Sequence, residues 1–133
     1  MEVRYADLDA QGHLNNAKFL TYFEQARVLY LTELGLFSRG QSFDEIGVIV
    51  ADIHIRYKAP VVWGTPIKVG VRTAEIGGKS LTLQQCLADA ETDRLYAVGT
   101  VILVAYDYSR HESMAVPEHW RQVILGFEHL PLK

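Results

Sequence analysis

The sequence predicts an α+β fold, in which one long helix packs against a mostly antiparallel sheet. Two hydrophobic periods carry this prediction. From about residue 16 to residue 34, apolar side chains recur at spacings of three and four, which is typical of a helix with one buried face. Beyond Gly47 the period becomes two and continues, interrupted by turn residues, to about residue 106. The 133 residues fit one domain, so we expect a single domain over residues 1–133.

A short first strand at residues 3–5 is expected to precede the long helix. The residues that share the buried helix face are Phe19, Phe23, Ala26, Tyr30 and Leu34. Asn15 or Asn16 is suited to cap the N-terminus, and Gly35 stands where a left-handed cap would end the helix.

The next strand begins after Gly47 and is expected to end before Pro60. Simple alternation places two sets of side chains on its two faces: Ile49, Ala51, Ile53, Ile55 and Tyr57 on one, and Asp52, His54, Arg56 and Lys58 on the other. Two further strands, at residues 67–76 and 80–90, flank Gly77-Gly78, which we expect to supply the positive-φ turn of a hairpin.

Residues 95–106 are apolar on both faces, which predicts a strand that is central or covered twice. Residues 107–116 are expected to form a loop, and Pro117 suits the first turn of a short closing helix. The apolar stripe of that helix is Trp120, Val123, Ile124 and Phe127. One long helix cannot cover all the apolar surface of this sheet, so self-association is predicted.

Composition excludes several classes of function. The net charge of −3 comes without a basic block, so nucleic-acid binding is unsupported. No segment approaches the roughly 18 apolar residues of a membrane span. The single cysteine, Cys86, fits a reducing compartment, and the first residues lack the features of a signal peptide, so a cytoplasmic protein is expected. No His/Cys spacing supports a metal site.

The segment from Asp7 to Asn16 carries the candidate chemistry. It places carboxylates, a glycine, an imidazole and two carboxamides just before a helix. A helix start leaves backbone N–H groups unpaired and partially positive, which favours an oxyanion. A carboxylate facing the same carbonyl could deprotonate water or attack as a nucleophile. Thioester hydrolysis, which passes through an anionic tetrahedral species, needs these two elements.

The pattern Asp-x-Asp-x-x-Gly-His-x-Asn-Asn, followed by the run from Tyr22 to Arg27, resembles the 4-hydroxybenzoyl-CoA thioesterase family of hotdog proteins. The likeness extends through Tyr57-Lys58-Ala59-Pro60, the Gly64 turn, the Gly78-Lys79-Ser80 hairpin and the Pro117 helix, and so covers nearly the whole chain. It implies a hotdog fold: a five-stranded antiparallel sheet wrapped around a central long helix, with a short C-terminal helix. It also implies homodimers joined sheet edge to edge, often paired into homotetramers, with the sites at the dimer interface.

The resemblance maps the catalytic aspartate onto Asp9 and the carbonyl-polarising amide onto Asn16 or Asn15. Some family members carry an aromatic pair at these asparagines, so a preference for aromatic acyl groups is not implied. Asp7 is expected to be structural. His13 either contacts the substrate carbonyl, positions water or orients Asp9, or is a loop histidine satisfied by backbone.

Four further residues are candidates for substrate binding or for ordinary structural roles. Gly12 and Asn15 belong to the loop and helix cap, and Lys58 and Lys79 are either contacts for CoA phosphates or solvated charges. Glu24 and Arg27 are spaced for an intrahelical ion pair, and could instead reach the site or a second subunit.

The leading hypothesis is therefore hydrolysis of a small or medium acyl-CoA, or of an acyl-carrier-protein thioester, to the free acid and thiol. It requires no cofactor. One alternative is an acyl-CoA hydratase or dehydratase, but the Asn-Pro that such enzymes carry between their Asp and His is missing between Asp9 and His13. The other is a non-catalytic protein that binds acyl thioesters on the same fold.

Overall fold

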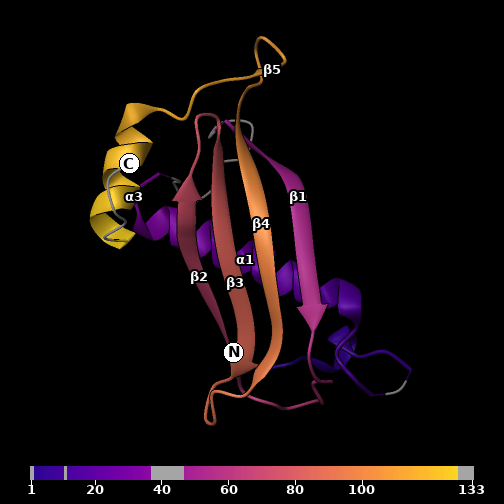
Figure 1. The fold of residues 1–133 in the computed structure, drawn as a ribbon. Coiled ribbons are helices and arrows are strands. Elements are labelled where there is room, and N and C mark those ends of the chain that lie inside the picture. The colour runs from indigo at the N-terminus through magenta and orange to yellow at the C-terminus, as the bar shows by residue number, and fades with distance from the viewer. Residues whose placement is uncertain (1, 11, 37–46, 129–133) are drawn as a thin grey trace.

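The computed structural model describes residues 2–10, 12–36 and 47–128. Its elements are, in chain order, the 3₁₀ helix η1 (Tyr5–Asp7), α1 (Asn16–Glu33), β1 (Val48–Tyr57), β2 (Ile67–Ile76), β3 (Ser80–Asp89), β4 (Leu95–Asp107), β5 (Glu112–Ser113) and α3 (Glu118–Glu128). The strands form one antiparallel sheet in the order β1-β4-β3-β2, and β5 pairs with the end of β4 (Figure 1).

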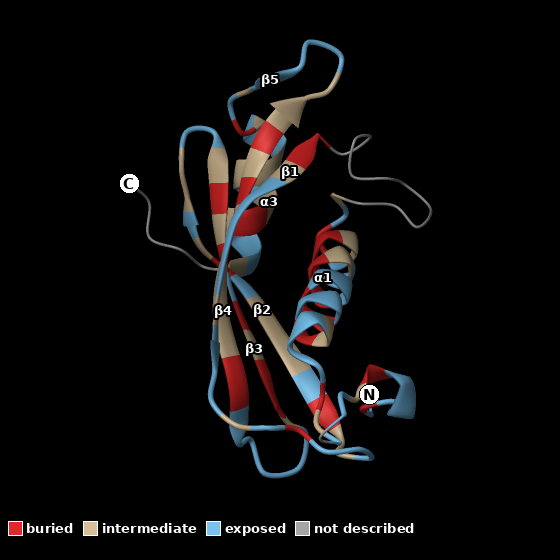
Figure 2. Ribbon diagram, turned by 90° about the vertical axis from the view of Figure 1, so that its right-hand side faces the viewer, coloured by how far each residue is buried: buried red, intermediate tan, exposed pale blue. Residues whose placement is uncertain are grey.

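The helix α1 lies across one face of this sheet and begins and ends where its caps predicted (Figure 2). The side chain of Asn15 accepts a hydrogen bond from Ala17 N at 2.8 Å, and Gly35 adopts a φ of 75°. All five side chains predicted for its buried face are buried. One of them, Phe23, lies so close to β4 that a Cβ at Gly99 would be 2.8 Å from its Cε2 atom. The core is therefore the layer between α1 and the sheet.

The strand β4 is central, as its two apolar faces predicted. It pairs with β1 on one side and β3 on the other. Val101 and Leu103 face α1 and are fully buried, while Val98 and Ile102 are half-buried on the opposite face. Figure 2 shows the sheet curving around α1, the hotdog arrangement that the resemblance implied.

The predicted faces of β1 are correct only beyond residue 51. A β-bulge shifts the register between Val50 and Asp52. Ile49 therefore pairs with Val104 on the face away from α1, whereas Ile53 pairs with Val101 on the face toward it. The bulge adds one residue to the strand and so reverses the alternation, which a strict period of two cannot represent.

Three other local predictions need correction. Residues 3–5 form no strand: η1 begins at Tyr5, and only Glu2 makes an isolated bridge, to Pro66. The hairpin at Gly77-Gly78 forms, but neither glycine has a φ in the left-handed region. A Cβ at Gly77 would lie 2.8 Å from Ser80 Oγ, a contact that rotation of the serine side chain can relieve. The predicted loop 107–116 contains β5, the fifth strand of the sheet.

The closing helix α3 lies beside β2 at the edge of the sheet (Figure 1). Ile124 is fully buried in the same apolar cluster as Leu83 and Leu103, whereas Phe127 is 57% exposed. Among the described residues, no helix has the length and apolar character to span a membrane.

Candidate active site

The loop before α1 is closed by its own backbone. Leu8 and Leu14 form an antiparallel bridge, and within it Asp9 N donates to His13 O at 2.7 Å. Gly12 N donates to Asp9 O at 3.0 Å, and Gly12 has a φ of 79°, which a residue without Cβ adopts at little cost. This closure brings Asp9 and His13 together, with Gly12 as the turn that permits it.

The carboxylate of Asp9 is directed by the same loop. The backbone N–H of His13 donates to Asp9 Oδ1 at 3.2 Å. Asp9 is exposed and the His13 side chain is half-buried. Asp9 is thus oriented by an amide while its carboxylate remains accessible to a ligand.

Asp7, by contrast, is a structural carboxylate, which fits the role predicted for it. It is 1% exposed and accepts hydrogen bonds from Arg4 Nε at 2.9 Å and from Tyr22 OH at 2.6 Å. The hydrogen bonds from Arg4 and then from Tyr22 lower the pKa of Asp7 below its ordinary value. Because Tyr22 belongs to α1, Asp7 fixes the loop to the helix that follows it.

The start of α1 leaves one backbone amide for a ligand. The Asn15 side chain occupies Ala17 N, and Asn15 O accepts from Lys18 N at 2.8 Å. Within the described residues, the backbone N–H of Asn16 donates to no protein group. Asn16 O is held by the hydroxyl of Tyr57 at 3.1 Å. The first amide of the helix is therefore positioned and open.

These groups line one pocket of about 340 Å³. Its lining residues are Asp9, His13, Leu14, Asn16, Phe19, Tyr57, Lys58, Ala59 and Pro60. The rings of Phe19 and Tyr57 meet edge to face, with their centroids 5.1 Å apart, and form an aromatic wall. Of the predicted site residues, the structure thus brings together Asp9, His13, Asn16 and Lys58.

The other predicted binding residues lie outside this lining. Gly12 shapes the loop, and the Asn15 side chain is used in capping α1. Lys79 lies in the β2–β3 turn, at the other end of the sheet, where its Nζ donates to Ser113 Oγ at 3.3 Å (Figure 1). Within one chain Lys79 is therefore remote from Asp9.

Sequence reasoning missed Phe19 and Tyr57 as part of the site. Phe19 was assigned to the helix core and Tyr57 to a strand face. The available signal was that Tyr57 adjoins Lys58-Ala59-Pro60, a stretch already noted in the resemblance. It could not be used without knowing that the end of β1 reaches the start of α1.

The pairing suggested for Glu24 and Arg27 does not form. Arg27 is 4% exposed, and its Nη1 donates to Gln85 Oε1 at 3.0 Å, while Glu24 is exposed and makes none of the ion pairs among the described residues. Burial lowers the pKa of Arg27. Arg27 therefore links α1 to β3. No cluster of three metal-binding side chains occurs in the described ranges.

Known proteins are similar to this chain over nearly its whole length. A model of the family described as Thioesterase-like superfamily matches residues 3–124. The long-chain acyl-CoA thioesterase FadM of Escherichia coli (strain K12) is 25% identical over 122 residues, which cover 92% of each protein. The acyl-CoA thioesterase YbgC of Haemophilus influenzae (strain Rd) is 26% identical over 132 residues, covering 98% of this chain and 93% of the relative.

A solved structure extends this similarity to three dimensions. It is a thioesterase from Thermus thermophilus, complexed with coenzyme A and Zn. Its sequence is 31% identical to this chain. The superposition covers 98% of this chain and 93% of the Thermus chain, with a TM-score of 0.85.

Proposed function

The chain belongs to the Thioesterase-like superfamily and is a thioester hydrolase, and we propose that it hydrolyses a small or medium acyl-CoA, or an acyl-carrier-protein thioester, in the Asp9 pocket. The observation that carries this proposal is the convergence of an accessible carboxylate, that of Asp9, and an open helix amide, that of Asn16, on one pocket.

In the proposed reaction, the thioester carbonyl oxygen accepts a hydrogen bond from Asn16 N–H. The partial positive charge of the α1 N-terminus stabilises the negative charge that develops on this oxygen. Asp9 either takes a proton from the attacking water or attacks the carbonyl carbon itself, and the C–S bond breaks to release the thiolate. In the second case water then hydrolyses the mixed anhydride on Asp9, which releases the acid and restores the carboxylate. His13 is suited to position the water or the carbonyl. Every element is supplied by the chain, so the proposal includes no cofactor.

Substrate size and CoA contacts are part of the proposal. A volume of about 340 Å³ lies at the lower end of ordinary ligand sites, which supports a small or medium acyl group. Lys58, in the pocket wall, is proposed to meet a phosphate of CoA. A cytoplasmic location is also proposed, in line with the single cysteine.

We further propose a homodimer joined through β1, with pairs of dimers forming a homotetramer. β1 is an edge strand, and three of its apolar side chains that face α1 are exposed: Val50 is 42%, Ile53 38% and Tyr57 43% exposed. Pairing β1 with β1 of a second copy would cover them. Because Tyr57 also lines the pocket, the site would then lie at the interface. In antiparallel pairing the strands of the second copy run in the opposite direction. The β2–β3 turn of that copy, with its Lys79, would then lie at the same end of the composite sheet as this pocket.

The test is release of free thiol from a panel of acyl-CoAs by the wild type and by Asp9→Asn. We expect the substitution to lower kcat by at least about 100-fold, because the base or nucleophile is lost. Folding and the affinity for a non-hydrolysable acyl-CoA thioether should persist. Asp93→Asn is the control: Asp93 is also exposed, pairs with Lys68 at the surface, has a φ of 63° that Asn accepts, and lies in the β3–β4 turn.

Two alternatives are separated by the same panel. Enoyl-CoA hydration without thiol release would support a hydratase, and saturable binding with no turnover would support a non-catalytic binding protein. Full activity of Asp9→Asn would refute the role proposed for Asp9.

A further inference from the structure

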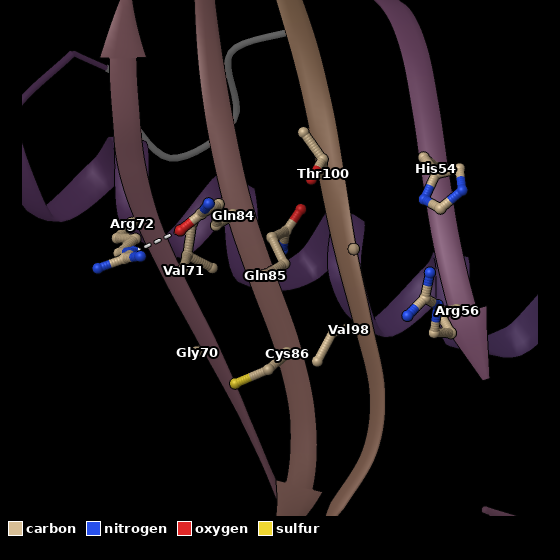
Figure 3. A pocket seen from close by; sticks show the side chains of 11 residues that line it. His54, Arg56, Gly70, Val71, Arg72, Gln84, Gln85, Cys86, Val98 and Thr100 are labelled. Atoms are coloured by element: carbon tan, nitrogen blue, oxygen red, sulfur yellow. Dashed lines mark hydrogen bonds between the residues drawn. The ribbon is translucent and has the colours of Figure 1, made fainter. Parts of the chain in front are cut away.

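A second and larger cavity, of about 610 Å³, lies on the face of the sheet opposite α1 (Figure 3). We call it the outer groove. It shares no lining residue with the Asp9 pocket. Its volume falls within the range of small-molecule sites. The outer groove is therefore a separate candidate site.

Two adjacent cross-strand rows form the outer groove. The register between strands gives the first row as Arg56, Val98, Cys86 and Gly70. It gives the second as His54, Thr100, Gln84 and Arg72. Figure 3 shows the cationic side chains on the outer strands β1 and β2, with neutral side chains between them.

The outer groove is cationic. Its lining contains two arginines and a histidine and no carboxylate. Asp52 and Glu75, which share this face, belong to the next row and do not line the groove. Arg72 Nε is engaged by Gln84 Oε1 at 2.7 Å. The side chains of His54 and Arg56 have no hydrogen-bond or ion-pair partner in the part of the chain that the structure describes.

The floor beside Arg56 is apolar and open. It runs from Val98 over Cys86 to Gly70, across two strand spacings of about 4.8 Å each. A Cβ at Gly70 would lie 3.0 Å from the sulfur of Cys86. The absence of a side chain at this position therefore keeps the far end of the floor clear.

We propose that the outer groove binds an amphipathic carboxylate, with its head at Arg56 and His54 and its apolar chain along Val98 and Cys86 toward Gly70. A carboxylate fits because an arginine donates to it in a charge-assisted, bidentate manner. An apolar chain fits because the floor offers no hydrogen-bonding side chain along this row. The binding is non-covalent and does not depend on turnover at Asp9, although acids of this class are products of thioester hydrolysis.

A second copy of the chain is a less suitable occupant. Two copies related by a two-fold axis through the groove would present the same cationic patch to each other. Like charges facing one another across an interface oppose association. A carboxylate, in contrast, supplies the charge that the groove lacks.

Cys86 makes the groove testable, because it is the single cysteine of the chain and lies on the floor. The rate of its alkylation by iodoacetamide is measured on the full chain with decanoate, 1-decanol or acetate. Decanoate should slow alkylation saturably, and by about tenfold when binding is saturated, because the chain covers the sulfur. Acetate lacks the long apolar chain and 1-decanol lacks the carboxylate, so both should have little effect on the alkylation rate at the same concentrations.

Calorimetric titration with decanoate provides a second measurement that does not depend on thiol reactivity. Arg56→Gln should weaken binding roughly tenfold or more, because a charge-assisted hydrogen bond is lost. Arg110→Gln, an exposed arginine outside the groove, is the matched control and should bind as the wild type does.

These experiments test the outer groove and the proposed catalytic pocket independently of each other. Asp9→Asn should keep the Cys86 protection by decanoate, whether or not the proposed hydrolysis is correct. Equal protection by 1-decanol, or unchanged affinity in Arg56→Gln, would overturn the proposal. So would protection of Cys86 that rises with protein concentration in the absence of ligand, which would identify the occupant as a second copy.

Discussion

At the scale of single residues, Asp7 connects the loop before α1 to the stability of the fold. Its carboxylate is buried against Tyr22 and Arg4, so the ionised form is favoured in the folded chain. The lowered pKa of Asp7 means that the unfolded chain takes up this proton at a higher pH than the folded chain does. The stabilising contribution is therefore complete above the unfolded pKa and is lost as the pH falls through the folded pKa.

We expect Asp7→Asn to lower the free energy of unfolding by about 1–3 kcal/mol at neutral pH, because charge-assisted hydrogen bonds in a buried position are lost. The difference from the wild type should shrink below the ordinary carboxyl pKa of 3.8 and vanish at the acid end. Urea titrations at a series of pH values measure it. Asp52→Asn, at an exposed carboxylate on the outer face, is the control and should be nearly neutral. A difference between Asp7→Asn and the wild type that is constant with pH would contradict this linkage.

The residues that line the candidate site could be predicted as neighbours from the sequence where they lie on one continuous segment. Asp9, His13 and Asn16 fall within eight residues, and local backbone bonds are enough to bring them together. Tyr57 comes from the far end of β1, so its place in the pocket depends on packing between distant segments. The position of Lys79, remote from this pocket within one chain, was hidden for the same reason, since a turn residue carries no local signal of which end of the sheet it will occupy.

At the scale of elements, the distance between α1 and β4 depends on Gly99. A Cβ at this position would lie 2.8 Å from Phe23 Cε2 and 3.0 Å from His54 O. His54 O belongs to the backbone, and the Phe23 ring is fully buried, so neither atom can move aside easily. The helix can therefore settle against the sheet only because residue 99 has no side chain.

Gly99→Ala should destabilise the protein by about 1–3 kcal/mol through overpacking. Gly126→Ala is the opposite control, since a Cβ there meets no atom within 4 Å and Gly126 lies within α3. It should be neutral or stabilise by up to about 1 kcal/mol, because alanine favours a helix. Urea unfolding of both variants measures the contrast. A Gly99→Ala protein as stable as the wild type would show that α1 can move away without cost.

The hydrophobic periods and the helix caps predicted α1 and the long strands in the correct order, because both signals are local. These local signals could not predict the bulge in β1. The bulge is defined by the register of β1 against β4, and Val50-Ala51-Asp52 carries no glycine or proline to mark it. The positive φ expected at Gly77-Gly78 was also wrong, because this hairpin turns without a left-handed φ at either glycine.

At the scale of the whole molecule, the exposed edge at β1 predicts the assembly. Ile53→Lys should convert the proposed dimer to a monomer, because it places a charge on the apolar patch of Val50, Ile53 and Tyr57. Sedimentation velocity measures the change. Thiol release should fall with it, since Tyr57 belongs both to this edge and to the pocket. Leu29→Lys, at a 54% exposed leucine of α1, is the control and should leave the dimer intact. An unchanged sedimentation coefficient for Ile53→Lys would exclude β1 as the interface.

The helix α3 has a consequence for how far such an assembly can grow. A sheet has two lateral ends, and in this chain one is β1 while the other, β2, has α3 beside it (Figure 1). Once two copies have joined through β1, the composite sheet ends on both sides in a strand flanked by a helix. Addition of further copies in the same direction is then blocked, so strand pairing closes at two chains instead of continuing into a filament.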